Sequence, residues 1–183
     1  TKEINNLLNN EEEEMVYCIC RYCGDDFEAE EKVEVCEDCK EVLDNADNPE
    51  LIFALAEEFD CSVQDVVDKG DGEFSIDGLD YLVLTEDEAE KRVEEYIEYT
   101  LWAFNPSFLA GVTDMPIEVF EVLCEKCEGG NEAIKSIVDK TCGIEELAEE
   151  AVRWDGRGHF LSSYDGQEIE VYADGEYYYC YRQ

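Results

Sequence analysis

Ten cysteines occur in this chain of 183 residues, and four of them have the spacing of a metal site. Cys20 and Cys23 form one Cys-x-x-Cys pair, and Cys36 and Cys39 form a second pair after twelve intervening residues. Two such pairs are typical of a small zinc ribbon, in which four thiolates complete the tetrahedral coordination of Zn²⁺. A closed set of four sulfur ligands leaves no position for water, so we expect a structural ion that folds a small module.

The remaining cysteines leave alternatives open. Cys18 could replace one of the four ligands, and the four thiols could instead be free or redox-active. Cys124 and Cys127 form a third pair, but they fall within an apolar pattern of helical spacing, so we interpret them as core cysteines. The isolated cysteines are interpreted in the same way: Cys61, Cys142 and Cys180.

Residues suited to catalysis are scarce. The single histidine, His159, stands in Arg157-Gly158-His159 with no nucleophile elbow, phosphate loop or histidine-based metal motif around it. We expect this segment to form a structural polar corner before a strand. The sequence therefore predicts a protein that is not an enzyme.

Charge is the strongest signal in the composition. The chain has 50 acidic and 13 basic residues, and its formal net charge is −37. Such a chain repels nucleic acid, so any partner that it binds by electrostatics must be strongly basic. Halophilic adaptation also loads a surface with carboxylates, but compositions of that type are usually rich in arginine, which is infrequent here.

One acidic stripe has a regular spacing. A helix over residues 86–104 places Asp87, Glu90, Glu94 and Glu98 on one face, with neighbours about 4.5 to 6 Å apart along the axis. Phosphates along a DNA strand advance by about 3.4 Å, which is the same order of spacing. Any single acidic helix face can be an ordinary solvated surface. Later helices extend the pattern, however, and the stripe therefore predicts a surface that imitates DNA. The residues that extend it are Glu118, Glu121 and Glu125, and Glu145, Glu146, Glu149 and Glu150.

Turn and cap signals predict the elements that carry these residues. Asn48 and Pro49 begin a short helix, Ser62 caps another that runs through Val66, and Thr85 with Glu88 forms a capping box. Asp77-Gly78 joins two strands into a hairpin. Further helices are expected at about 116–127, 132–140 and 144–153, and a three-stranded antiparallel meander at 159–164, 167–173 and 176–183.

These elements define an α+β fold with three parts. Residues 1–14 form an acidic tail, residues 15–48 a zinc-ribbon-like module, and residues 49–183 an α+β domain with a helical middle and the C-terminal meander. No secretion signal or membrane-spanning segment is visible in the sequence, so we expect cytoplasmic localisation, with reduced thiols.

The second half of the chain also carries a resemblance. Tyr81–Thr85, Leu101–Asn105 and Asp155–Gly166 resemble segments of an uncharacterised family of proteins encoded by bacterial phages and mobile elements. The resemblance covers roughly the last hundred residues. The acidity is similar to that of phage and plasmid DNA-mimic proteins that block restriction or CRISPR nucleases.

These observations together predict an acidic DNA mimic. In this hypothesis the carboxylates occupy the DNA-binding cleft of a basic protein such as a restriction or CRISPR nuclease and exclude DNA. If the chain is phage-encoded, it acts in the cytoplasm of the host cell. The alternative is a zinc-ribbon adaptor that binds another protein through the tyrosine-rich last strand and uses its charge for solubility.

Overall fold

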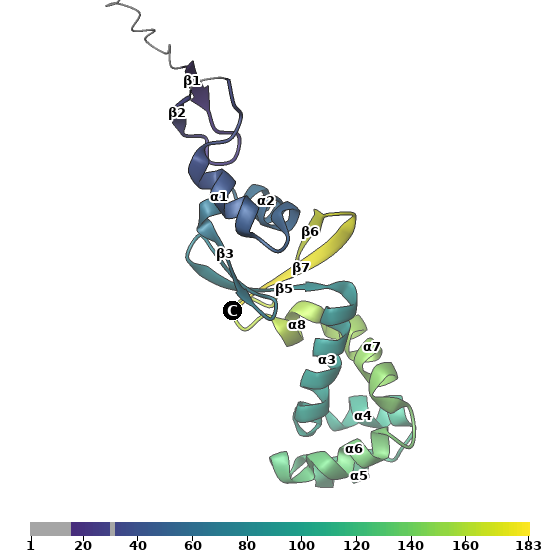
Figure 1. Cartoon of the computed structure of the whole chain (residues 1–183). Helices are drawn as coiled ribbons and strands as arrows, with labels where there is room; N and C mark the ends of the chain where they lie inside the picture. Colours follow the sequence, from purple (N-terminus) through teal and green to yellow (C-terminus); the bar gives the residue numbers. More distant parts are fainter. Residues whose placement is uncertain (1–15, 30–31) are drawn as a thin grey trace, which may run out of the picture. The chain divides into compact units, whose positions relative to one another are not determined.

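The computed structural model describes residues 16–29 and 32–183, and the chain divides into two compact units between Val66 and Val67 (Figure 1). The predicted tail, 1–14, lies outside the described residues. The predicted boundary after residue 48 falls inside the first unit, because the elements on both sides of it contact one another. Each unit is described by itself below.

The first unit joins a hairpin to short helices. Its elements are β1 (Val16–Ile19), β2 (Asp26–Ala29), α1 (Glu37–Asn45), α2 (Pro49–Glu58) and η1 (Val63–Asp65). β1 and β2 pair antiparallel. The Asn48 side chain accepts a hydrogen bond from the Leu51 N–H at 3.0 Å, which confirms the predicted start of α2. The Ser62 cap is also present, but the helix that it begins ends at Asp65.

The second unit contains a five-stranded sheet with the strand order β3-β4-β5-β7-β6. Its strands are β3 (Val66–Gly70), β4 (Glu73–Ile76), β5 (Leu79–Thr85), β6 (Ile169–Ala173) and β7 (Glu176–Arg182). The predicted hairpins at Asp77-Gly78 and Asp174-Gly175 are both confirmed. All four turn residues have positive φ, the geometry that the twist of a two-residue hairpin requires.

The predicted meander is wrong in its first strand. Residues 157–161 form a short helix, α8 (Arg157–Leu161), so the C-terminal part contributes two strands and β7 pairs on its other side with β5. The chain folds back tightly after α8: a Cβ at Gly158 would lie 2.2 Å from the Gly166 carbonyl oxygen. The Ser162 hydroxyl accepts hydrogen bonds from the Asp165 and Gly166 N–H groups, which makes this segment a capped loop and not a hairpin turn.

Helices fill the chain between β5 and β6. They are α3 (Glu86–Thr100), η2 (Leu101–Ala103), α4 (Pro106–Thr113), α5 (Ile117–Cys124), η3 (Cys127–Gly130), α6 (Asn131–Val138) and α7 (Gly143–Asp155). The Thr85 and Glu88 capping box is present at the start of α3. The predicted helix over 86–104 ends at Thr100 and continues as η2. No helix is predicted at α4, which begins at Pro106 just after this segment.

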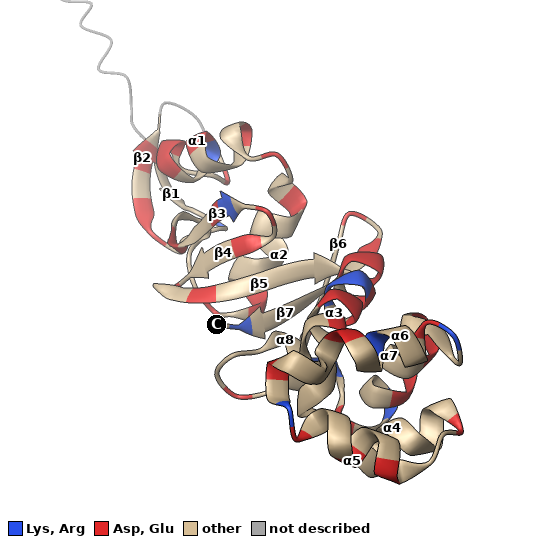
Figure 2. Ribbon diagram, turned by 90° about the horizontal axis from the view of Figure 1, so that it is seen from below, with Lys and Arg blue, Asp and Glu red and all other residues tan. Residues whose placement is uncertain are grey.

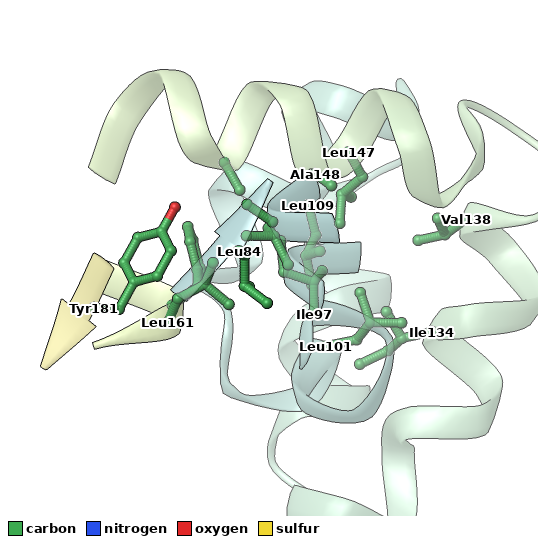
Figure 3. Packing of buried hydrophobic residues seen from close by; sticks show 14 of the residues in the cluster. Leu84, Ile97, Leu101, Leu109, Ile134, Val138, Leu147, Ala148, Leu161 and Tyr181 are labelled. Atoms are coloured by element: carbon green, nitrogen blue, oxygen red, sulfur yellow. The ribbon is translucent and has the colours of Figure 1, made fainter. Parts of the chain in front are cut away.

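The core of the second unit forms around α3 (Figure 3). Ile97 and Leu101 are fully buried and belong to one cluster with Leu109 of α4, Leu147 of α7 and Tyr181 of β7. Figure 1 shows α3 leaving the end of β5, with α4, α5 and α6 gathered at its far end. α3 is therefore fixed between the sheet and the other helices. In the described part of the chain, no helix has the length and apolar character needed to cross a membrane.

Candidate metal centre and acidic groove

The four predicted ligands come together in the first unit. The sulfur atoms of Cys20, Cys23, Cys36 and Cys39 all lie within 4.8 Å of one another, and Cys23 Sγ is 3.8 Å from Cys36 Sγ. A tetrahedral Zn²⁺ with Zn–S bonds of about 2.3 Å sets its sulfur atoms about 3.8 Å apart. The arrangement therefore has the size of a tetrathiolate metal site. Cys18, the alternative ligand, lies on β1 and is not part of this group.

Two different local structures position the two pairs. Cys20 and Cys23 lie in the turn after β1, where the Gly24 N–H donates to the Cys20 carbonyl at 2.9 Å. Cys36 is the N-cap residue of α1, and Cys39 lies in the first turn of that helix. The zinc-ribbon-like interpretation places both pairs in similar knuckle turns, and the structure instead presents the second pair from the start of a helix.

Backbone hydrogen bonds favour a thiolate at Cys20. Burial raises the pKa of Cys20, but N–H groups aimed at its sulfur, including that of Cys36 at 3.4 Å, outweigh burial and lower it to about 6. Burial raises the pKa of Cys23, and it raises the pKa of Cys39 to about 11 although the Gln64 side chain opposes it. A bound cation removes the protons from such thiols, so metal binding and thiol ionisation are coupled here.

Gln64 is a residue of this site that sequence reasoning missed. Its Nε2 donates to Cys39 Sγ at 3.5 Å, from η1, and Cys39 is fully buried. Groups that hydrogen-bond to metal ligands hold those ligands in place. No local motif marks Gln64, because its contact depends on how η1 packs on α1. This contact explains why the metal site belongs to a unit that extends beyond residue 48.

The other cysteines divide between core and surface. Cys180 is buried, and the Cys124 thiol donates to the Phe104 carbonyl at 3.8 Å beside the core cluster. The prediction that Cys127 is a core residue is wrong, because the helix ends at Cys124 and Cys127 is exposed with a φ of 51°. The pair is therefore not presented on one helical face.

The four residues of the predicted acidic stripe have different surroundings. Asp87 and Glu90 are exposed, whereas Glu94 and Glu98 are half-buried. Glu98 Oε1 lies 2.6 Å from the Lys135 Nζ of α6 and is therefore neutralised within the unit. Of these four residues, Glu90 and Glu94 line a groove between α3 and α7.

A groove of about 520 Å³ lies between α3 and α7, which contact each other. Figure 2 shows acidic residues on both helices. Five glutamates line this groove, together with an apolar floor and two arginines. The lining residues are Glu86, Glu90, Val93 and Glu94 of α3, Glu145, Ala148, Glu149, Val152 and Arg153 of α7, and Arg157 of α8. We call this surface the acidic groove.

The two arginines do not neutralise most of the groove. Arg153 pairs with Glu150, and Arg157 pairs with Glu86 and with Glu168 outside the groove. Burial and the neighbouring carboxylates of Glu145 and Glu90 raise the pKa of Glu94. These carboxylates repel one another across a partly desolvated surface. A bound cation would reduce this repulsion, so the groove favours cationic ligands.

Arg157 connects three elements of the second unit. Its Nε lies 2.8 Å from Glu168 Oε2, its Nη1 forms an ion pair with Glu86 Oε1 at 2.8 Å without an aligned hydrogen bond, and its guanidinium covers the Tyr179 ring at 4.0 Å. The Tyr181 hydroxyl also donates to Glu168. The polar corner predicted around residues 157–159 therefore centres on Arg157, and His159 is exposed.

Comparison with models of protein families, with curated proteins and with solved structures finds no match for this chain. The resemblance to a phage and mobile-element family therefore stays a prediction. The fold and the site define an α+β chain with a cluster of four cysteines in one unit and an acidic groove in the other.

Proposed function

We propose that this chain binds a strongly basic, nucleic-acid-binding protein through the acidic groove and thereby excludes nucleic acid from it. The observation that carries the proposal is the convergence of five glutamates from two helices on one concave surface. A lysine or arginine side chain fits this chemistry, because its apolar stem can cover Val93 and Val152 while its charged end meets the carboxylates.

The lining of the acidic groove revises the set of residues that we expect to contact the partner. Glu90 and Glu94 stay in the proposed surface, and Glu145 and Glu149 join them from α7. Asp87 is exposed outside the groove lining, and we place it at the rim. Glu98 contributes less, because displacing Lys135 from it costs an existing ion pair.

The partner class follows from charge. A net charge of −37 excludes nucleic acid itself as the ligand and favours proteins whose function requires a basic cleft. Within this class we propose a restriction or CRISPR nuclease, in agreement with the resemblance to phage and mobile-element proteins. The chain would then act as an inhibitor and not as an enzyme.

We propose that the cysteine cluster holds Zn²⁺ with a structural role. Four thiolates at tetrahedral spacing suit zinc, and two of the four residues, Cys20 and Cys39, are almost completely buried. The ion would fix the turn after β1 to the start of α1. Protein purified without chelator should contain one equivalent of zinc by elemental analysis, and less than half an equivalent would contradict the assignment.

The nuclease proposal is tested by protection of DNA. Purified chain is added to a restriction endonuclease with its cognate duplex, and the concentration that halves cleavage is measured at low and at physiological salt. We expect inhibition that weakens as salt rises, because exposed charges are screened beyond about 8 Å at physiological ionic strength. A gel-shift with the duplex alone should show no binding.

Matched variants test whether inhibition of the nuclease depends on the acidic groove. The pair Glu90→Lys and Glu94→Lys reverses two charges in the groove, and the pair Glu170→Lys and Glu176→Lys reverses two exposed charges on β6 and β7. Glu168 is unsuitable as a control because it pairs with Arg157. We expect the groove pair to lose inhibition and the strand pair to keep it; the reverse result would favour the adaptor hypothesis.

A second candidate function, the protein-binding adaptor, is supported by one observation. Tyr172 and Tyr177 are paired across β6 and β7, with ring centroids 4.9 Å apart, and both are largely exposed. Exposed tyrosines are frequent in protein interfaces. The rest of the last strand fits this function less well, because Tyr181 is fully buried in the core.

A further inference from the structure

The four cysteines of the candidate metal site differ in how far solvent reaches them. Cys20 and Cys39 are almost completely buried. Cys23 and Cys36 are half-buried. Oxidation of a thiolate requires that the oxidant reaches its sulfur, so exposure selects among cysteines that are otherwise alike. The two sulfurs that a small oxidant can reach therefore come one from each Cys-x-x-Cys pair.

The two half-buried sulfurs also lie next to each other. Cys23 Sγ and Cys36 Sγ are 3.8 Å apart. A disulfide joins its sulfurs at about 2.05 Å, so the two atoms need to approach each other by about 1.8 Å. Cys23 lies in the turn after β1, and Cys36 is the N-cap residue of α1. A bond between them would join the two segments that present the cluster.

Hydrogen bonds hold the two buried sulfurs in place. Cys20 Sγ accepts from the Cys36 N–H at 3.4 Å. Cys39 Sγ accepts from Gln64 Nε2 at 3.5 Å. A disulfide within either Cys-x-x-Cys pair would shift one of these buried sulfurs away from its hydrogen-bond donor. A bond between Cys23 and Cys36 needs no such displacement.

We infer that Cys23 and Cys36 form a site of reversible two-electron oxidation by a small neutral peroxide, of which hydrogen peroxide is the simplest. One of the two thiolates attacks a peroxide oxygen, the O–O bond breaks and hydroxide leaves, which converts that thiolate to a sulfenic acid. The other thiolate attacks the sulfenic sulfur, the S–O bond breaks and a second hydroxide leaves. Two electrons in total pass from the sulfurs to the peroxide oxygens, and the product is a disulfide.

The charge around the site favours this class of oxidant. Four exposed acidic residues flank the two cysteines in the sequence, and one exposed arginine, Arg21, pairs with one of them. The acidic residues are Asp25, Glu34, Glu37 and Asp38. An anionic oxidant such as glutathione disulfide is repelled by this field. Hydrogen peroxide carries no charge and is small enough to reach a half-buried sulfur.

The disulfide would compete with metal binding, so this inference deepens the proposed role of the cluster and rests on that role for the release of the ion. Two thiols remain after oxidation, and two ligands do not complete a tetrahedral site. One disulfide stabilises a fold less than a structural ion does. We therefore expect oxidation to release the ion and to loosen residues 16–66, and reduction with added zinc to restore both.

The test uses the full chain as purified, with its zinc content measured first. The reduced protein is treated with a few equivalents of hydrogen peroxide at neutral pH, the remaining thiols are blocked with N-ethylmaleimide, and disulfides are mapped by mass spectrometry. Cleavage after Arg21, Lys32 and Glu37 places the four cysteines of the cluster on different peptides. We expect Cys23 joined to Cys36 as the main product, and one ion released per disulfide, measured with a chromophoric chelator.

Three variants make the result specific. Cys36→Ser removes one partner and should abolish the disulfide at Cys23. Cys61→Ser removes a half-buried cysteine of the same unit, and Cys127→Ser removes an exposed cysteine of the other unit. Both should leave the yield of the disulfide and the release of the ion unchanged. Because Cys36→Ser also removes a proposed ligand and can unfold the first unit, the map of the parent protein decides the pairing.

Three outcomes would overturn the inference. They are a main product within one Cys-x-x-Cys pair, a main product that includes Cys61 or Cys127, and cysteines of the cluster that stay reduced in excess peroxide. Purified chain without zinc would contradict the proposed zinc site, and the disulfide map would still decide the pairing. The proposals can therefore fail independently.

Discussion

The two units of this chain are held together by different means. The second unit has a continuous apolar core in which Ile97, Leu101, Phe120 and Tyr181 are fully buried. The first unit buries few side chains larger than alanine, mainly from α2 and η1, and its hairpin leaves Tyr17 and Ile19 exposed. Two cysteines of the cluster, Cys20 and Cys39, are among the most buried side chains of this unit. The hydrophobic effect can therefore fold the second unit, whereas we expect the first unit to depend on an ion held by its cysteines.

Removal of the proposed metal ion should have the largest effect, and this effect should be confined to the first unit. Apparent binding free energies of structural zinc are about 10–16 kcal/mol, more than the whole stability of many small domains. A chelator, or Cys39→Ser, should therefore unfold residues 16–66 and leave residues 67–183 folded. Amide spectra with and without chelator measure both units at once.

Cys127→Ser is the matched control, because Cys127 is exposed and distant in sequence from the cluster. It should change neither unit. Dispersed amide signals for residues 16–66 in metal-free protein would show that the first unit folds without a metal and would remove the contrast.

Truncation of a core side chain should destabilise the second unit and leave the first unit unchanged. Phe120→Ala removes a fully buried ring, which typically costs about 3–5 kcal/mol of stability. Thermal unfolding should show a lower transition for the second unit, while the zinc content stays the same. Val122→Ala, on the same helix but 57% exposed, should change stability by less than about 0.5 kcal/mol. Equal effects of the two variants would contradict the core described above.

The Arg157 contacts should come next in magnitude. Arg157→Met leaves Glu86 and Glu168 without their cation, and because the arginine side chain is only 13% exposed we expect a loss of about 2–3 kcal/mol, below the range for fully buried pairs. Arg153→Met removes an arginine that is 67% exposed and should cost less than about 1 kcal/mol. Urea unfolding of the second unit measures both.

This network also gives a pH dependence with a definite sign. A hydrogen bond from Tyr179 lowers the pKa of Glu86. Burial acts in the opposite direction, and Arg157 lowers the pKa further. A lowered carboxyl pKa stabilises the fold at neutral pH, and this contribution is lost as pH falls through the folded-state pKa. Arg157→Met should reduce this loss. If the variant and the parent lost stability equally on acidification, Arg157 would not be the relevant partner.

The smallest expected effect is a gain in stability. Burial and the charges of Glu145 and Glu90 raise the pKa of Glu94. A raised carboxyl pKa makes the folded state less stable as pH rises from the unfolded-state pKa to the folded-state pKa. Glu94→Gln should therefore stabilise the second unit at neutral pH by about 0.5 kcal/mol, the scale of like-charge pairs on helices. Asp87 lies in the first turn of α3, where the helix dipole favours a negative charge, so Asp87→Asn should give no such gain. A loss of stability in Glu94→Gln would contradict the electrostatics of the acidic groove.

Local sequence signals predicted the elements that have local causes. Asn48-Pro49 and the Thr85 and Glu88 box mark helix starts because the side chains that satisfy the first N–H groups are only a few residues away. The same signal occurs at Asn105-Pro106, where it begins α4, although no helix is predicted there in our reading of the sequence. That element could have been predicted from the sequence.

Other features depend on contacts between distant segments. α8 replaces a predicted strand because Gly158 packs against Gly166, and the β propensity of the segment gives no sign of this contact. The cluster of four cysteines was predictable from their spacing, but the contact of Gln64 with Cys39 was not. The sequence marked the acidic faces of both helices, but it did not show that Glu145 and Glu149 face α3, so it identified the walls of the acidic groove and not the groove itself.

NMR mapping of a basic probe shows whether a basic ligand binds in the acidic groove, on which the proposed function depends. Full-length chain labelled with ¹⁵N is titrated with a lysine decapeptide at physiological salt. We expect amide shifts at Glu90, Glu94, Glu145 and Glu149, and we expect these shifts to disappear in the variant with Glu90→Lys and Glu94→Lys. Shifts confined to residues 16–66, or unchanged in that variant, would contradict binding in the acidic groove.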